Sequence, residues 1–598
     1  MKRPRLLLLT TFIACLSSCS LKQIVEDVFN PSKTNNYDED PTTEITTDTS
    51  SNDYDKVIEE EVVETPDEFT GENITTITES GNYHFQGEVA PITIKKNLEV
   101  YLFFDGVTIQ SDTGKAIDGK TETKVHIVLQ NGSTNSIKTS IDKNALGVDG
   151  DLYLSGNGTL NIESSQKKGI KTDGDIYVSG ENLTLNVSSS DHAINGRSIT
   201  VNKSTVNVTS SGSDGLQAEC DDTTTAFTKD QGFIYLVDAN ISADTYGDGI
   251  QADSYVYISG GETSITTHGE FVSYSTANMT TYELETDDFK FVKSGSSYKR
   301  VAKDEIRTLN SNYYAFTQSV KGIKAGAIKD SSGNDITIGD YEISIAHLAK
   351  VKVKSSDDCI HTNYGKVSLD SCNLELDTMD DGVHADYDLN ITNASIGITS
   401  SYEGLEGANV TINGANTNIV SYSNDDGINA ASDFVNQTNI TINDGFLRIY
   451  AQGDGVDANT ALYFKGGTTI VEGPGSGNGS LDSDKIYFQG GIVFACSTSG
   501  MTESMTATQC TFAYQGSTMS TNKIISITDS NSNPLFSYTL KQSCNQLIFS
   551  HPDMKVGSSY NIMADSSKIT TISMSSTLTK VGVSGGGPGG GGGPGGHH

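Results

Sequence analysis

The sequence predicts an all-β protein built as a right-handed parallel β-helix, with three short strands per coil and a C-terminal β-rich cap. The main observation is a recurring phrase of the form Asp-Gly-Ile/Val-polar-Ala. Its copies are SDGLQAE (213–219), GDGIQAD (247–253), DDCIHTN (357–363), DDGVHAD (380–386), YEGLEGA (402–408), DDGINAA (425–431) and GDGVDAN (453–459). The central residue of the later copies stands at positions 359, 382, 404, 427 and 455. Looser copies surround residues 147, 169 and 193. So regular a short period is typical of a solenoid.

Apolar residues alternate with polar ones between the copies of the phrase. Leu389 and Ile391 form one such run, and Ile396 and Ile398 form the next. A period of two predicts strands with one buried face. The phrase itself supplies one short strand and the two alternating runs supply two more, so each coil has three strands separated by turn residues. Stacked coils bury these faces together, whereas leucine-rich repeats and propeller blades fit the pattern less well.

The chain begins with a predicted lipoprotein signal peptide over residues 1–18. Three basic residues near the start precede an apolar stretch that is too short to span a bilayer. The sequence Leu16-Ser17-Ser18-Cys19 then resembles a bacterial lipobox, whose cysteine is acylated. We therefore expect export and lipid anchoring at the bacterial cell surface through Cys19. The alternative is an ordinary cleaved signal with an incidental cysteine.

The remaining segments follow from composition and from the repeat. Residues 19–69 are acidic and rich in Ser and Thr, which predicts a solvated tether. The β-helix is expected over residues 70–490, with an insertion at about 269–318 that forms a loop or small subdomain. Residues 491–583 should form the cap that covers the open end of the solenoid, and residues 584–598 a Gly/Pro-rich flexible tail.

A net charge of −36 makes the protein strongly acidic. A surface of this charge disfavours nucleic acid as a partner. Polyanionic partners would also be repelled unless a cation lies between them.

One acidic residue stands directly before the central residue in each clear copy of the phrase. In a stack of coils these side chains should form columns, in which neighbouring charges repel by about 4 kcal/mol at 4 Å. A hard cation would relieve the repulsion, and Ca²⁺ accepts irregular oxygen geometry. The alternative is that each acid caps its own turn. The predicted metal ligands are Asp214, Asp248, Asp358, Asp381, Glu403, Asp426 and Asp454.

A stripe of polar residues lies two positions after the central residue. These side chains should face outward, opposite core residues such as Val383. The geometry requires a break in the pleat at the intervening glycine, and we expect a positive φ there. A solvated face is one interpretation of the stripe, and contact with a ligand is the other. Together with Tyr402, the candidate binding residues are His361, His384, Glu406, Asn429 and Asp457.

Six stretches carry a resemblance to a known family. They are SSDDCIHTN, DDGVHADYDLNIT, SYEGLEGANVTING, NDDGINAA, GDGVDAN and GNGSLDSD, followed by a Gly-rich tail. The chain resembles secreted bacterial carbohydrate-binding β-helices, whose calcium-containing solenoids bind polygalacturonate, the backbone of pectin. The resemblance spans about residues 78–583, and it implies binding of an acidic polysaccharide through Ca²⁺ without catalysis. The sequence departs from the family pattern at residues 366–371, at Cys359 and in the insertion.

Three other functions stay open from the sequence. Pectate lyases share this shape, and Lys324 or Lys171 could act as the base. Asp357-Asp358-Cys359 superficially matches an element of polygalacturonases, although the accompanying elements of that family are missing. A structural surface adhesin is the third possibility. The chain has no Trp, which argues against the usual aromatic platform for neutral sugars, although its 26 Tyr still allow stacking.

Overall fold

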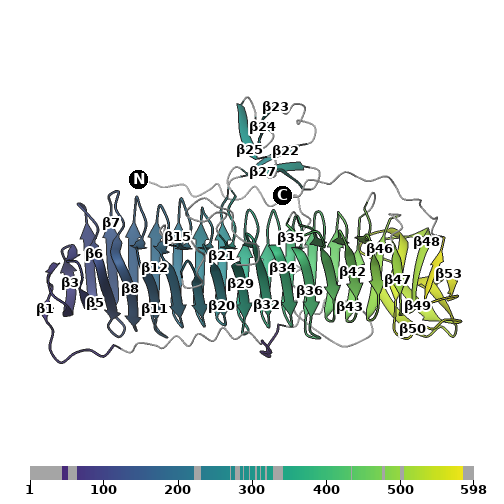
Figure 1. Cartoon of the computed structure of the whole chain (residues 1–598), viewed down its shortest axis with the longest axis horizontal. Coiled ribbons are helices and arrows are strands. Elements are labelled where there is room, and N and C mark those ends of the chain that lie inside the picture. Colours follow the sequence, from purple (N-terminus) through teal and green to yellow (C-terminus); the bar gives the residue numbers. More distant parts are fainter. Residues whose placement is uncertain are drawn as a thin grey trace, which may run out of the picture.

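The computed structural model confirms the predicted fold class. It describes main chain and side chains for residues 44–50, 63–220, 231–269, 319–326, 341–432, 434–474, 478–498 and 504–582, and the strands of the insertion between 271 and 316. Every regular element in these ranges is a strand, and the described residues include no helix that could cross a membrane. The coils stand in a row along the long axis of the molecule (Figure 1). The signal peptide and most of the expected tether lie outside the described residues.

Each coil contributes one strand to each of three parallel ladders. Ile360 pairs with Val383 in the first ladder, Val367 with Leu389 in the second, and Leu374 with Ile396 in the third. All six side chains are buried in one core cluster that runs through the stack of coils. The apolar residues at period two therefore form the inner face of the solenoid, as the sequence predicts.

The N-terminal coils combine two ladders in several long strands. They comprise β1 (Gly71–Glu72), β2 (Thr76–Ile77), β3 (Gly81–Val89), β4 (Ile92–Ile94), β5 (Glu99–Ser111), β6 (Ile117–Leu129), β7 (Thr134–Thr139), β8 (Leu146–Gly156) and β9 (Thr159–Ser164).

The first ladder carries the recurring phrase. It continues through β10 (Ile170–Thr172), β13 (Ile194–Gly196), β16 (Leu216–Ala218), β19 (Ile250–Ala252), β28 (Ile323–Ala325), β31 (Ile360–Thr362), β34 (Val383–Thr392), β36 (Leu405–Asn413), β38 (Ile428–Ala430), β41 (Val456–Ala458) and β44 (Leu481–Ser483). Strands β34 and β36 are long enough to serve the second ladder as well.

The other two ladders complete the coils. The second has β11 (Asp175–Ser179), β14 (Ser198–Asn202), β17 (Ile234–Val237), β20 (Tyr255–Ser259), β29 (Tyr341–Ala346), β32 (Gly365–Asp370), β39 (Asn439–Ile442), β42 (Ala461–Phe464), β45 (Ile486–Phe488) and β47 (Met505–Ala507). The third has β12 (Thr184–Ser189), β15 (Thr205–Ser210), β18 (Asn240–Thr245), β21 (Glu262–Thr267), β30 (Lys350–Lys354), β33 (Asn373–Asp377), β35 (Ser395–Ser401), β37 (Asn418–Ser423), β40 (Phe446–Ala451), β43 (Thr468–Glu472) and β46 (Ile492–Ser497).

The insertion folds outside the ladders as two small antiparallel sheets (Figure 1). One sheet contains β22 (Phe271–Ser275), β26 (Ile306–Leu309) and β27 (Asn312–Phe316), and the other contains β23 (Glu283–Thr286), β24 (Phe289–Ser294) and β25 (Ser297–Ala302). The chain then returns to the solenoid, where Ile323 pairs with Ile250 of the preceding coil.

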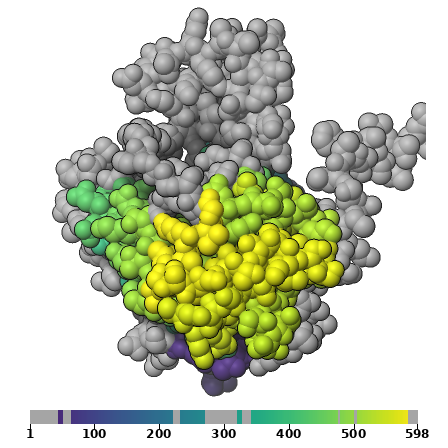
Figure 2. Space-filling model, turned by 90° about the vertical axis from the view of Figure 1, so that its right-hand side faces the viewer, coloured from purple at the N-terminus to yellow at the C-terminus, as the bar shows by residue number. Residues whose placement is uncertain are grey.

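Most pairings of the C-terminal strands are antiparallel, and these strands cover the end of the solenoid, as Figure 2 shows in yellow. They are β48 (Thr511–Met519), β51 (Cys544–Ser550) and β54 (Leu578–Val581), followed in space by a sheet of β49 (Ile524–Asp529), β50 (Pro534–Thr539), β52 (Ser559–Ala564) and β53 (Ser567–Ser573).

A buried carboxylate fastens this cap to the last coils. Glu472 accepts a hydrogen bond of 2.6 Å from the Tyr538 hydroxyl. It also accepts the backbone N–H groups of Lys541 and Gln542 at 2.9 and 2.7 Å. The guanidinium of the buried Arg448 lies 5.5 Å from the centre of the Tyr538 ring. A buried carboxylate needs partners of this kind, so the contact fixes the cap in one position.

Part of the expected tether lies against the solenoid. Residues 44–50 cross the coils near Asn373, whose side chain bonds both the N–H and the C=O of Ile45 at 2.7 and 3.2 Å. Asp48 lies 2.8 Å from Nδ1 of His347. Ile45 is buried by this contact. This stretch is therefore held by specific hydrogen bonds rather than fully solvated.

The central glycine of the phrase has a different role from the one expected. Gly382 is not among the described glycines with positive φ, so that expectation is wrong. The reason for glycine is close packing between coils. A Cβ on Gly382 would lie 2.5 Å from the carbonyl oxygen of Gly404, and a Cβ on Gly404 would lie 2.3 Å from that of Gly427. Cys359 occupies the same position in its coil and is fully buried.

Replacing Gly427 with alanine should therefore destabilise the solenoid. The new Cβ would lie 2.5 Å from the oxygen of Gly455 and 2.1 Å from Cγ2 of Ile449. We expect a loss of about 1–3 kcal/mol in the free energy of unfolding, measured by urea denaturation. Gly114→Ala is the matched control, because a Cβ there has no neighbour within 4 Å. Equal stability of the two variants would contradict the close-packing explanation.

Candidate metal centre

Register stacking brings the predicted acidic residues into one column. Asp358 Oδ1 accepts the backbone N–H of Asp381 at 3.0 Å, and Asp381 Oδ1 accepts that of Glu403 at 3.2 Å. Asp426 Oδ1 accepts the N–H of Asp454 in the same way. One oxygen of each carboxylate thus binds the next coil, not its own turn. The second oxygen is left to meet other groups.

A second column lies one residue earlier in the chain. Tyr402 N–H donates to the carbonyl of Asp380 at 2.6 Å, and Asp425 N–H donates to the carbonyl of Tyr402 at 2.8 Å. Asp357 occupies the same position one coil before Asp380. Tyr402 therefore lies between Asp380 and Asp425 in this column, next to the acidic column of the candidate site.

The polar stripe forms a third column on the first ladder. Its register runs through Lys324, His361, His384, Glu406, Asn429, Asp457 and Asp482. The side chains of His361, His384 and Glu406 are only 11, 12 and 16% exposed. The stripe is therefore not the solvated face that one interpretation expected. Its side chains face one another and the acidic column.

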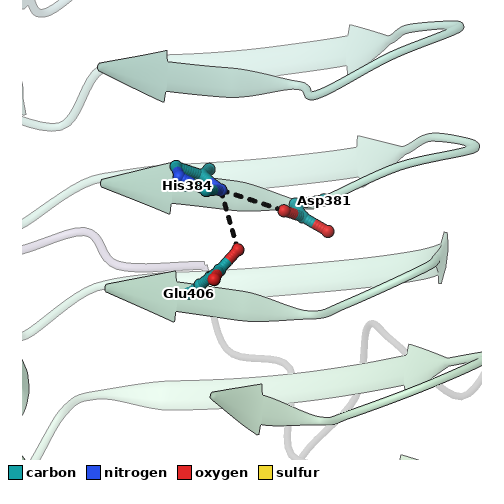
Figure 3. Close-up of side chains that lie close together, drawn as sticks. All are labelled: Asp381, His384 and Glu406. Atoms are coloured by element: carbon teal, nitrogen blue, oxygen red, sulfur yellow. Dashed lines mark hydrogen bonds and ion pairs between the residues drawn. The ribbon is translucent and has the colours of Figure 1, made fainter. Parts of the chain in front are cut away.

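Asp381, His384 and Glu406 form the first cluster with metal-ligating atoms (Figure 3). His384 Nδ1 lies 3.1 Å from Asp381 Oδ2 and 2.7 Å from Glu406 Oε2. Burial by itself lowers the pKa of His384, but Glu406, Asp381 and Asp386 outweigh burial and raise that pKa well above its usual range. Burial and the neighbouring Asp380 raise the pKa of Asp381. Without a metal, the imidazolium is therefore the cation of this cluster.

The second cluster, Asp357, Asp358 and Asp380, already contains a cation. Lys321 Nζ lies 3.1 Å from Asp357 Oδ1 and 2.7 Å from Asp358 Oδ2, and all three side chains are largely buried. Burial opposes ionisation of Asp358, but Lys321 outweighs it and holds the pKa of Asp358 well below its usual range. An ammonium group thus does here what a metal would do.

The third cluster contains carboxylates alone. Ligand atoms of Asp426, Asp454 and Asp457 all lie within 4.8 Å of one another. Burial and the carboxylates of Asp425, Asp457 and Asp454 raise the pKa of Asp426 to about 9. Burial raises the pKa of Asp454 to about 6, with Asp482 contributing. An all-oxygen donor set under mutual repulsion is the arrangement that suits a hard divalent cation.

The remaining candidates have other neighbours. Asp214 and Asp248 are adjacent in the column, since Asp214 Oδ1 accepts the N–H of Asp248 at 2.7 Å. Asp214 lies 3.3 Å from His192, and Asp248 lies 3.9 Å from Lys324. Basic side chains thus accompany both acids. Further along, Glu403 accepts a hydrogen bond of 3.0 Å from Asn429, which joins the acidic column to the stripe.

Several residues of the clusters were not among the predicted ligands. Asp380 and Asp425 are the first acids of the pairs in DDGVHAD and DDGINAA, so a doubled acid was the available signal. Lys321 precedes Gly322 and so occupies the acidic position of its coil. Asp482 pairs in register with Asp457. It lies in the stretch GNGSLDSD, where Gly479 and Ser480 replace the usual Asp and Gly of the phrase. Asp386, two residues after His384, forms a hydrogen bond with the His384 ring, and only the structure shows this contact.

Comparison with known proteins identifies the family. A model of the carbohydrate-binding domain-containing protein family matches residues 70–382 and 371–533, and the chain belongs to this family. A solved structure of a polysaccharide lyase-like protein from C. thermocellum, a gadolinium derivative, is 21% identical, with a TM-score of 0.28. The match covers 32% of this chain and 80% of that chain. No curated protein matches. Carbohydrate binding is therefore the function class of this solenoid.

The third cluster predicts how stability depends on pH. The folded pKa values of Asp426 and Asp454 are about 9 and about 6, against about 3.9 in an unfolded chain. Above pH 4 these two carboxyl groups therefore bind more protons in the folded protein than in the unfolded chain. Their contribution to the free energy of unfolding without metal should fall as pH rises from about 4 to 9, and Asp454 should account for about 3 kcal/mol of that fall.

Thermal unfolding of chelator-treated protein between pH 4 and 9 measures this loss. Asp426→Asn should flatten the profile above pH 6, and saturating Ca²⁺ at pH 8 should restore stability to the unmodified chain. A loss of stability between pH 5 and 8 that is no smaller in Asp426→Asn than in the unmodified chain would contradict this contribution.

Proposed function

We propose that this protein is a non-catalytic, surface-anchored carbohydrate-binding protein that captures an acidic polysaccharide such as polygalacturonate through bridging Ca²⁺. The observation that carries the proposal is the third cluster, where ligand atoms of Asp426, Asp454 and Asp457 lie within 4.8 Å of one another. Carboxylate oxygens at this spacing are suitable ligands for Ca²⁺. Membership of a carbohydrate-binding family supports the class of ligand.

Net charge makes a bridging cation necessary for this ligand. The chain carries a net charge of −36, so a polyuronate and the bare protein repel each other. A Ca²⁺ ion held by three carboxylates has further coordination positions, because Ca²⁺ takes six to eight oxygen ligands. A uronate carboxylate can fill such positions. The ion then attracts protein and polysaccharide to the same point.

The polar stripe can supply the remaining contacts. Glu406 and Asn429 stand on the two rungs before Asp457, which itself belongs to the third cluster, at one strand spacing of about 4.8 Å. His361 and His384 extend the same stripe toward the N-terminus. Tyr402 lies in the adjoining turn. Because the side chains of His361, His384 and Glu406 are only 11, 12 and 16% exposed, sugar hydroxyls would contact only their exposed edges.

A lyase mechanism has less support from the geometry. Lys324, the first candidate base, stands five rungs before Asp457, which is roughly 24 Å at the usual strand spacing. Lys171 stands further away in the same register. Lys321 is clamped between Asp357 and Asp358, which raise its pKa well above the usual range against the effect of burial. A base must reach the uronate α-proton, and these lysines stand away from the third cluster.

Polygalacturonate binding with and without Ca²⁺ tests the proposal. We expect retardation in a polygalacturonate gel with millimolar Ca²⁺, and loss of retardation with a chelator. Asp454→Asn should weaken binding at least tenfold, because it removes a charged ligand from the ion. Glu375→Gln is the matched control, since Glu375 is an exposed acid on another ladder, paired with Lys352 at 2.7 Å.

The same incubation separates a binder from an enzyme. Unsaturated products that absorb in the ultraviolet would identify a lyase and contradict the non-catalytic proposal. Binding that persists without divalent ions, or that is weakened equally by Glu375→Gln, would contradict the bridging role of Ca²⁺. Neither binding nor product would favour a structural adhesin.

Surface anchoring is proposed from the sequence alone, since Cys19 lies outside the described residues. Lipidation at this residue would hold the protein at the outer face of the envelope. Cys19→Ser should abolish metabolic labelling with palmitate and release the protein into the medium. Unchanged labelling of that variant would contradict the anchor.

A further inference from the structure

The clusters along the column differ in donor chemistry. The third cluster offers oxygen atoms only, whereas the first combines His384 Nδ1 with one oxygen each from Asp381 and Glu406. Imidazole nitrogen suits Zn²⁺ and related ions, and Ca²⁺ prefers oxygen. The two clusters therefore favour different ions, although they belong to one solenoid and one column.

The separation of the donor atoms fits a small ion. His384 Nδ1 lies 3.1 Å from Asp381 Oδ2 and 2.7 Å from Glu406 Oε2. Tetrahedral ligands at 2.0–2.1 Å from Zn²⁺ lie about 3.4 Å apart, so the two pairs would have to separate by about 0.3 and 0.7 Å to admit the ion. His384 lies in β34 and Glu406 in the neighbouring β36, whereas Asp381 lies in the turn directly before β34; Figure 3 shows the three side chains together.

The other ring nitrogen of His384 is held in the way that metal-binding histidines usually are. His384 Nε2 lies 3.1 Å from Asp386 Oδ1, while Asp386 Oδ2 accepts the backbone N–H of Tyr364 at 2.8 Å. A carboxylate at this nitrogen fixes the orientation of the ring and increases the basicity of the opposite nitrogen. Nδ1 is thereby directed at Asp381 and Glu406. This contact lies outside the three-ligand cluster and is independent of it.

Burial limits the exchange of ligands but leaves access. The side chains of Asp381, His384 and Glu406 are 7, 12 and 16% exposed. Three protein ligands leave one tetrahedral position of Zn²⁺ for water or an external oxygen ligand. His361 stacks on His384 with ring centres 4.7 Å apart, and its Nδ1 lies 2.7 Å from Asp358, outside the donor set.

We propose that Asp381, His384 and Glu406 bind Zn²⁺, with Asp386 as the residue that orients His384. The site is distinct from the all-carboxylate Ca²⁺ cluster at Asp426, Asp454 and Asp457. The solenoid would then hold two kinds of divalent ion two to three coils apart.

Calorimetric titration of chelator-treated protein with ZnCl₂ tests the assignment. His384→Gln should remove one Zn²⁺ equivalent or weaken it at least 100-fold, whereas the matched variant His361→Gln should retain it. Asp386→Asn should weaken Zn²⁺ binding 10- to 100-fold, the usual effect of losing such an orienting carboxylate. Ca²⁺ affinity of the third cluster should change less than threefold in His384→Gln, which also verifies that the variant is folded.

Cobalt substitution gives a second readout. Co²⁺ bound at the first cluster should give visible absorption bands that His384→Gln and Glu406→Gln abolish and His361→Gln preserves. Equal Zn²⁺ binding by the His384→Gln and unmodified chains would overturn the proposal. Displacement of Zn²⁺ from this cluster by equimolar Ca²⁺ would overturn it as well.

Discussion

The main-chain hydrogen bonds between coils determine everything else in this molecule, because they hold equivalent residues of successive coils one strand spacing apart. The same bonds that bury Ile360, Val383 and Leu405 over one another also stack the residues that precede them in sequence. Carboxylates at this position accept the N–H of the next coil, as Asp358 does from Asp381. Like charges are thus brought together by the backbone and cannot separate without breaking the ladder.

The column meets the resulting repulsion in three ways along its length. In one coil the acid is replaced by Lys321, whose ammonium lies between Asp357 and Asp358. Two coils further, His384 on the adjoining stripe faces Asp381 and Glu406. Near the C-terminal end, burial and neighbouring carboxylates raise the pKa values of Asp426 and Asp454. The basic side chains that face this column therefore belong to the earlier coils, and the cluster of Asp426, Asp454 and Asp457 is the one for which we propose Ca²⁺.

Sequence alone predicts the features that follow from periodicity. The ladder partners and the core face follow from the spacing of the phrase and the alternation of residues such as Leu389 and Ile391. The acidic column follows from the same spacing. The fold class was predictable for this reason, because every coil repeats one register.

The cation partners within the column required the structure. Lys321 follows the insertion, so its position in the column depends on the residue at which the chain rejoins the first ladder. The contact of Asp386 with His384 depends on the path of β34 after its first residues. Gly382 shows a further limit of prediction from sequence. Glycine is needed there because a Cβ would clash with the carbonyl of the neighbouring coil, and not because the backbone has a positive φ. The sequence pattern alone could not distinguish these causes.

The segment at residues 44–50 changes where mechanical load enters the molecule. Asn373 and His347, which hold this segment, belong to coils in the middle of the solenoid. A pull on the chain upstream of residue 44 therefore reaches these two coils before it reaches β1. Such a pull would load the side-chain hydrogen bonds of Asn373 and His347, in the middle of the solenoid, and not the backbone ladder that holds β1.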